Sequence, residues 1–161
     1  MSDETYGFSH SKHLCGYMLA ITQLKALPPE LVDLEREASK QGFKFLGRLI
    51  EEWRTGSNRF NKPGERLLVA LAAGNIVGIG GLNVDPYKPI GDTARLRRLY
   101  VASSFRRRGV GEALVYALLK EASGTFRVIR LSTDTEAAAA FYVRLGFSAI
   151  EDETATHIKF L

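Results

Sequence analysis

The residues best suited to chemistry in this sequence are three arginines and two glycines. The arginines, residues 106–108, come directly before Gly109 and Gly111, after a predicted strand over residues 96–101 and at the start of a predicted helix. The first N–H groups of a helix have no intrahelical acceptor, and the helix dipole adds positive charge there. Glycine has no Cβ and arginine donates forked hydrogen bonds, so a phosphate can approach these N–H groups closely. The pattern predicts a site for a pyrophosphate or an equivalent group.

Two other phosphate-binding motifs do not fit this stretch. The dinucleotide fingerprint G-x-G-x-x-G needs a third glycine where this chain has Leu114. The G-x-x-x-x-G-K-[ST] loop of nucleotide hydrolases does not occur in the sequence. The spacing that does occur is R-x-x-G-x-G, formed by Arg106, Gly109 and Gly111.

Positive charge is concentrated at the same place. The formal net charge is +4, and six arginines with no acidic residue lie between Thr93 and Gly111. In the rest of the chain, 18 acidic residues outnumber 16 basic ones. A nucleic-acid-binding surface more often spreads lysine and arginine over a face that also carries aromatic residues. The charge distribution therefore favours a small polyanionic ligand and argues against a nucleic-acid partner.

The overall composition predicts one globular domain. The chain has 161 residues, of which 45% are hydrophobic and 25% charged. No apolar run approaches the roughly 20 residues that span a membrane, and the N-terminus lacks a signal sequence, so we expect a cytoplasmic protein with no membrane partner. The single cysteine, Cys15, cannot form an intramolecular disulfide. His10 and His13 lack the further ligands of a metal site, and no metal is expected.

Hydrophobic periodicity and turn residues predict the elements that position the arginines and glycines. A flexible segment is expected over residues 1–16. Helices are predicted over residues 30–41, 43–54, 110–122 and 136–145. Strands are predicted over residues 17–24, 66–73, 75–84, 96–101, 127–133, 148–151 and 156–160.

Two features of the predicted strand over residues 96–101 bear on function. Its apolar residues Leu96 and Leu99 are separated by two arginines, which breaks strict alternation and predicts a β-bulge. A helical crossover connects this strand to the one over residues 127–133, which predicts that the two are parallel neighbours. If the ends of the pair splay apart, they create a cleft.

These motifs resemble the GNAT superfamily of acyl-CoA-dependent N-acetyltransferases, whose pyrophosphate motif is [QR]-x-x-G-x-[GA]. The resemblance extends from about residue 67 to residue 147. It includes a second signature, N-x-x-A-x-x-[FL]-Y-x-x-x-G-F, which this chain matches from Thr135 to Phe147. Thr135 departs from the usual asparagine, so it offers one hydroxyl to the pantetheine arm in place of an amide.

The resemblance implies that residues 17–161 form one α/β (α+β) domain. Its centre would be a mixed, mostly antiparallel, twisted sheet of about seven strands flanked by about four helices. A splayed parallel strand pair would form the acyl-CoA cleft.

The resemblance also implies roles for individual residues. Tyr142 occupies the family position that faces the CoA sulfur and is the candidate general acid. Backbone N–H groups freed by the bulge would polarise the acyl carbonyl, as an oxyanion hole does. The residues expected to bind acyl-CoA are Leu99, Tyr100, Val101, Arg106, Arg107, Arg108, Gly109, Val110, Gly111, Thr135 and Ala138.

The resemblance assigns no general base. Some relatives place a carboxylate on the strand where this chain has Arg95 and Arg97. An arginine that points into the acceptor cleft would favour an acceptor that also carries a carboxylate or a phosphate. In the predicted helix over residues 43–54, the side chains of Glu51, Glu52 and Trp53 are candidates for contact with the acceptor. The base candidates are Asp85, Asp92, Glu51, Glu52 or a chain of water molecules.

The implied activity is transfer of an acetyl group from acetyl-CoA directly to the primary amine of a small molecule. Two alternatives stay open at this point. The acceptor is a protein or peptide amine, or the chain is a non-catalytic acyl-CoA-binding regulatory domain. The expected partners are acetyl-CoA and an amine acceptor, and a homodimer would be in keeping with the family.

Overall fold

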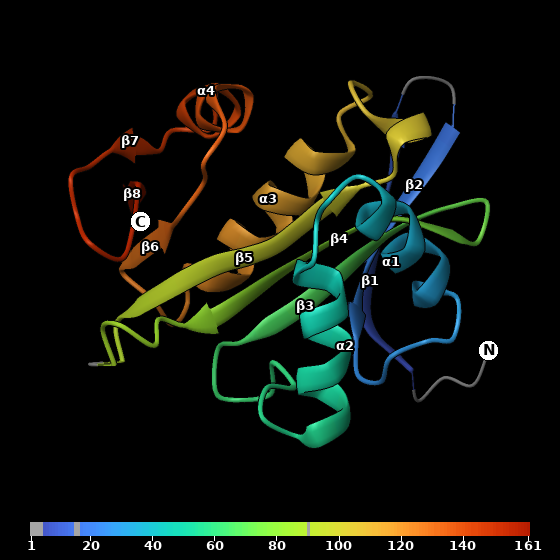
Figure 1. The fold of residues 1–161 in the computed structure, drawn as a ribbon, viewed down its shortest axis with the longest axis horizontal. Coiled ribbons are helices and arrows are strands. Elements are labelled where there is room, and N and C mark those ends of the chain that lie inside the picture. The colour runs from blue at the N-terminus through green and yellow to red at the C-terminus, as the bar shows by residue number, and fades with distance from the viewer. Residues whose placement is uncertain (1–4, 15–16, 90) are drawn as a thin grey trace.

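The computed structural model describes residues 5–14, 17–89 and 91–161 and contains one eight-stranded sheet (Figure 1). The strand order is β1-β2-β3-β4-β5-β6-β8-β7, and β5 and β6 form a parallel pair in an otherwise antiparallel sheet. The strands are β1 (Tyr6–Leu14), β2 (Tyr17–Leu24), β3 (Arg66–Ala72), β4 (Asn75–Val84), β5 (Thr93–Val101), β6 (Val128–Leu131), β7 (Ser148–Ala149) and β8 (His157–Phe160).

Four α-helices flank the sheet: α1 (Leu31–Lys40), α2 (Phe45–Thr55), α3 (Val110–Ala122) and α4 (Glu136–Arg144). Figure 1 shows α1 and α2 in front of the sheet and α3 behind it. Leu114 and Leu118 of α3 are fully buried against the sheet. The predicted mixed sheet with four helices and a parallel crossover pair is confirmed.

The N-terminal segment differs from the sequence prediction. Residues 1–16 are predicted to be flexible, but Tyr6–Leu14 forms β1, which pairs antiparallel with β2 and makes the eighth strand. The polar sequence of this segment gives no hydrophobic alternation, and backbone pairing at a sheet edge does not require one. Residues 1–4 and Cys15 lie outside the described residues.

The predicted bulge in β5 is confirmed. Ile79 of β4 pairs with Tyr100 and Gly81 pairs with Arg97, so two residues of β5 lie opposite one residue of β4. Arg98, the first of these two, has a φ of +62°, in the left-handed region that non-glycine residues rarely adopt. The bulge bends the strand and re-aims the side chains that follow it.

The parallel pairing of β5 with β6 is short. It covers the pairs Thr93 with Val128, Ala94 with Ile129 and Arg95 with Arg130, and then β5 continues to Val101 without β6. Because β6 ends at Leu131, the second half of β5 has no strand partner on that side in the described part of the chain. An opening between the strands follows.

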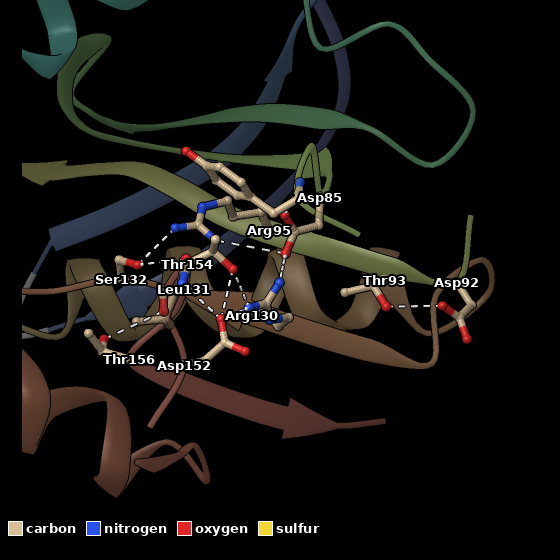
Figure 2. Close-up of polar contacts among 11 residues, drawn as sticks. Asp85, Asp92, Thr93, Arg95, Arg130, Leu131, Ser132, Asp152, Thr154 and Thr156 are labelled. Carbon is tan, nitrogen blue, oxygen red and sulfur yellow. Dashed lines mark hydrogen bonds and ion pairs between the residues drawn. The ribbon is translucent and has the colours of Figure 1, made fainter. Parts of the chain in front are cut away.

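A buried polar cluster holds the two strands together where they diverge. Figure 2 shows Arg95 of β5 and Arg130 of β6 both directed at Asp85, whose side chain is fully buried. The Asp85 Oδ2 atom lies 3.0 Å from Arg130 Nη1 and 3.7 Å from Arg95 Nη1. Arg130 also donates to Asp152 and Thr154, each at 2.6 Å. The cluster therefore ties β5, β6 and the segment before β8 into one unit.

A second polar cluster ties α1 to the far end of β5. The Tyr100 hydroxyl donates to Glu37 at 2.6 Å, and the Ser103 hydroxyl donates to the same carboxylate at 2.9 Å. Burial opposes ionisation of Glu37, but the hydrogen bonds from Tyr100 and Ser103 outweigh it and lower the pKa of this carboxyl. Burial and the bond to Glu37 raise the pKa of Tyr100 to about 12. The tyrosine is therefore a neutral donor at physiological pH.

We predict that Asp85→Asn destabilises the protein by about 3–5 kcal/mol, because it leaves two buried guanidinium groups without their shared counter-charge. Urea unfolding at neutral pH measures the change. Asp33→Asn is the matched control, since Asp33 is 84% exposed and its pair with Arg36 spans 3.9 Å. An Asp85→Asn variant as stable as the control would show that the cluster does not hold the strands.

We predict that Glu37→Gln destabilises the protein by about 1 kcal/mol at pH 7, since it removes a charge that accepts hydrogen bonds from Tyr100 and Ser103. The folded-state pKa lies below the ordinary value of 4.5. The stabilisation is thus complete above pH 4.5 and is lost as the pH falls through the folded-state value. The difference between wild type and variant should shrink below pH 4.5. A difference that stays constant with pH, or one equal to that of the exposed control Glu153→Gln, would refute this role.

Candidate active site

The opening between β5 and β6 is an open cleft with a volume of about 830 Å³. One wall is the second half of β5, the facing wall is the loop after β6 with the start of α4, and the connection between α1 and α2 closes the front. The lining residues are Gly42, Phe43, Lys44, Phe45, Arg48, Arg95, Leu96, Arg97, Arg98, Leu99, Tyr100, Val101, Arg106, Ser132, Thr133, Asp134, Thr135, Ala138, Phe141 and Tyr142.

The structure brings many of the predicted site residues to this cleft. Those that line it are Leu99, Tyr100, Val101, Arg106, Thr135, Ala138 and Tyr142. The other five, Arg107, Arg108, Gly109, Val110 and Gly111, lie at the start of α3 and are not among the lining residues. Arg106 lines the cleft and belongs to the connection that leads to α3, so it links these two parts of the site.

The start of α3 has the geometry that an anion requires. Gly109 is the N-cap residue with a φ of +84°, and no side chain caps the helix. The N–H groups of the first turn therefore have neither an intrahelical nor a side-chain acceptor. Val110 is 1% exposed and packs in the core, so only its backbone can contact a ligand. An added Cβ on Gly111 would lie 3.4 Å from Phe141, which places this glycine beside α4 and the cleft.

Arg106 lies along the cleft wall. Its Nε donates to the Val101 carbonyl at 3.1 Å, its Nη2 donates to Gln41 at 2.6 Å, and its guanidinium carbon lies 5.3 Å from the centre of the Tyr100 ring. Arg107 and Arg108 are exposed. Three guanidinium groups beside an uncapped helix N-terminus form a donor set that fits a pyrophosphate.

The open edge of β5 supplies backbone donors inside the cleft. Beyond Arg95, this edge has no strand partner within the described residues, and Leu99, Tyr100 and Val101 line the opening. Along a strand, backbone N–H groups alternate between the two edges, so part of this stretch presents N–H groups toward the cleft. Such donors can polarise a carbonyl placed against them.

Tyr142 lies in the cleft wall contributed by α4. It is 7% exposed, and its ring packs edge-on against Phe141 and Phe147 at centroid distances of 5.0 and 5.6 Å. Burial raises the pKa of the Tyr142 phenol well above its ordinary value of 10. The group is therefore protonated at neutral pH and has a proton that it can donate to a ligand atom.

Thr135 is the N-cap residue of α4. Its hydroxyl oxygen accepts the Ala138 N–H at 3.1 Å, which satisfies one of the free donors of the first helical turn. The hydroxyl proton is the one donor that Thr135 can still offer to a ligand in the cleft.

The predicted base candidates do not line the cleft. Asp85 is buried in its cluster, and Asp92 accepts the Thr93 hydroxyl at 3.0 Å away from that cluster (Figure 2). Glu51 pairs with Arg54 on the exposed side of α2, and Glu52 pairs with Arg98 at 2.8 Å. Trp53, another predicted contact, packs against the core. These side chains are held by partners of their own.

Sequence reasoning missed the front of the cleft. The rings of Phe43, Phe45 and Tyr100 pack against one another as an aromatic ledge, at centroid distances of 5.9 to 6.2 Å. Arg48 also lines the cleft, and it lies in α2 one helical turn before Glu51 and Glu52, the predicted acceptor contacts. Asp134 is the one acidic residue of the lining. It directly precedes Thr135, the N-cap residue of α4, and no motif in the sequence places it in a cleft.

Metal ligands and membrane-spanning helices are the remaining features of the described residues that bear on function. No group of three or more His, Cys, Asp or Glu side chains is arranged to hold a metal ion in this part of the chain. Among the same residues, no helix is long and apolar enough to cross a membrane.

Comparisons with solved structures agree with this architecture. A proposed acetyltransferase from Exiguobacterium sp. 255-15 is 29% identical, with a TM-score of 0.76 over 88% of this chain and 93% of that chain. A ribosomal-protein-alanine N-acetyltransferase from Brucella melitensis is 21% identical, with a TM-score of 0.64 over 88% and 99% of the two chains, a level of identity that speaks for the fold alone. No curated protein sequence matches the chain significantly.

A family model makes the assignment. The model described as Acetyltransferase (GNAT) family matches residues 29–147, a stretch that contains α1 to α4, the bulged strand β5 and the cleft. The chain therefore belongs to the GNAT acetyltransferase family.

Proposed function

We propose that the protein transfers an acetyl group from acetyl-CoA to the primary amine of a small molecule. The observation that carries this proposal is the meeting of three features at one cleft. These are the unpaired edge of β5, a protonated tyrosine in the facing wall, and an arginine-rich helix N-terminus at the end of β5. The overall reaction forms an amide N–C bond and breaks the thioester C–S bond.

Each of these features has a task. When bound, acetyl-CoA supplies the acetyl thioester. The first turn of α3 with Arg106, Arg107 and Arg108 holds the pyrophosphate, and Thr135 and Ala138 border the pantetheine arm. N–H groups among Leu99, Tyr100 and Val101 polarise the carbonyl oxygen, and the Tyr142 hydroxyl gives its proton to the departing sulfur.

Positioning supplies a large part of the rate enhancement in this scheme. A thioester is already activated, so holding the amine against its carbonyl converts a bimolecular step into one that is effectively unimolecular. The cleft is open to solvent, so an amine can enter it. The carboxylates predicted as bases do not line the cleft, so a chain of water molecules carries the amine proton to solvent.

We predict that Tyr142→Phe lowers kcat roughly 100-fold and leaves the KM for acetyl-CoA little changed, because the substitution removes the proton donor and keeps the ring. Thiol release from acetyl-CoA is measured with amino acids, polyamines, aminoglycosides and peptides as acceptors. Tyr116→Phe is the control, since Tyr116 is 49% exposed on α3, outside the cleft lining. A Tyr142→Phe variant with the kcat of wild type would show that Tyr142 is not the acid.

The same assay separates the proposal from its alternatives. Turnover with peptides but not with small amines would place the acceptor among proteins. If no acceptor gives turnover although acetyl-CoA raises Tm, the chain is an acyl-CoA-binding domain. If acetyl-CoA neither raises Tm nor reacts, the proposal fails altogether.

A further inference from the structure

The wall of the cleft that faces α2 is strongly cationic. Six of the residues that line the cleft are lysine or arginine, and Asp134 is the one acid among them. One of the six, Arg106, belongs to the connection that leads to α3. The other five lie on β5 or at the start of α2: Lys44, Arg48, Arg95, Arg97 and Arg98.

Two of these five cations have carboxylate partners of their own. Arg98 pairs with Glu52 at 2.8 Å, and Arg95 lies 3.7 Å from Asp85, which Arg130 shares at 3.0 Å. Arg98 is 9% exposed and Arg95 is 11% exposed, so water screens their charges poorly. The remaining three cations form no ion pair with another described residue, so this wall keeps an excess of positive charge.

Both buried arginines also retain donors without an acceptor. Within residues 5–14, 17–89 and 91–161, Arg98 Nε and Arg95 Nη1 are buried side-chain nitrogens that make no hydrogen bond. Buried polar groups are rarely left in this state, and each such case calls for an explanation. The two nitrogens give this wall of the cleft hydrogen-bonding capacity that the described residues do not use.

Arg97 and Arg48 face the cleft without any carboxylate of their own. Neither forms an ion pair with another described residue. Arg97 is half-buried and lies between Arg95 and Arg98 in β5, and Arg48 lies on α2 and lines the same cleft. Burial lowers the pKa of Arg95 and of Arg98, and repulsion from Arg97 lowers both further. Arg97 and Arg48 therefore add positive charge to the cleft that no carboxylate partner balances.

The arginines assigned to acyl-CoA lie on a different element from Arg97 and Arg48. Arg106, Arg107 and Arg108 belong to the turn before α3, after the end of β5, whereas Arg97 precedes the bulge and Arg48 lies on α2. Arg97 and Arg48 are therefore available to the second substrate.

We propose that the acceptor is a primary amine that also carries a carboxylate or a phosphate, and that Arg97 and Arg48 bind this anionic group. The inference rests on the proposed function and names the acceptor class for the same cleft. A guanidinium binds either oxyanion through a forked pair of hydrogen bonds. Polyamines and aminoglycosides carry only positive charge, so the same wall repels them.

The cationic wall also explains how the reaction proceeds without an assigned base. Positive charge near an ammonium group favours its neutral form. An acceptor that is held through its own anion places its amine among these cations, where loss of a proton is easier than in water. The neutral amine is the form that attacks a carbonyl.

Matched acceptor pairs test the inference. O-phosphoethanolamine is compared with ethanolamine, and β-alanine with its amide, in wild type, Arg97→Gln and the control Arg36→Gln, whose arginine is 71% exposed on α1. We expect wild type to prefer at least one acid-bearing member by about tenfold or more in kcat/KM, and Arg97→Gln to remove most of that preference. The KM for acetyl-CoA should stay unchanged. The pair that shows the larger preference for its acid-bearing member indicates whether the site binds a phosphate or a carboxylate.

Equal use of the acidic and neutral members by wild type, or a preference that survives in Arg97→Gln, would overturn the inference. If no acceptor is acetylated, titration calorimetry on CoA-saturated protein tests whether the anion site binds an acid-bearing amine. Binding of O-phosphoethanolamine or β-alanine that Arg97→Gln abolishes supports the anion site while the transfer reaction itself fails. Absence of such binding by the wild-type protein overturns the site.

Discussion

The short pairing between β5 and β6 is the constraint on which the cleft depends. A parallel sheet interior normally leaves no room between neighbouring strands, because every backbone donor on one strand has an acceptor on the next. Here the pairing stops after Arg95, and a bulge at Arg98 turns the rest of β5 along a different course. The same event creates the opening and leaves backbone donors along its wall, so the site is a consequence of how the sheet is interrupted.

An interruption of this kind has to be stabilised by something other than sheet hydrogen bonds. Asp85 and Arg130 hold the base of the divergence, and Glu37 fixes its far end through Tyr100 and Ser103. Charges at the base are costly to bury, and they persist only with close partners. Arg95 belongs to this group and also donates to Ser132 at 2.8 Å in the facing wall. The residues that hold the two strands together where they diverge thus also contribute to the charge of the site.

Local pattern predicted most of the fold. Turn residues and periodicity gave β4 and α3 with the boundaries seen in the structure, and the two arginines between Leu96 and Leu99 correctly indicated the bulge. The strand β1 was missed, because its pairing with β2 depends on backbone contacts that a polar sequence does not reveal.

The site could be predicted where a motif marks it and not where contacts join distant residues. The arginine and glycine motif located the start of α3, and the second signature located Tyr142 in the cleft wall. The partners of Asp85 and Glu37 lie 45 and 63 residues away along the chain, beyond any periodic signal. For the same reason Glu52 looked available to a substrate, whereas in the structure Arg98 occupies its carboxylate.

A crystal structure of the protein with acetyl-CoA tests most directly whether the break between β5 and β6 forms the catalytic cleft. We predict that the thioester carbonyl oxygen lies within hydrogen-bond distance of an N–H group among Leu99, Tyr100 and Val101. The sulfur should face the Tyr142 hydroxyl, and the pyrophosphate should lie on the first turn of α3. A ligand bound on another face, or a thioester directed away from β5 into solvent, would contradict this assignment.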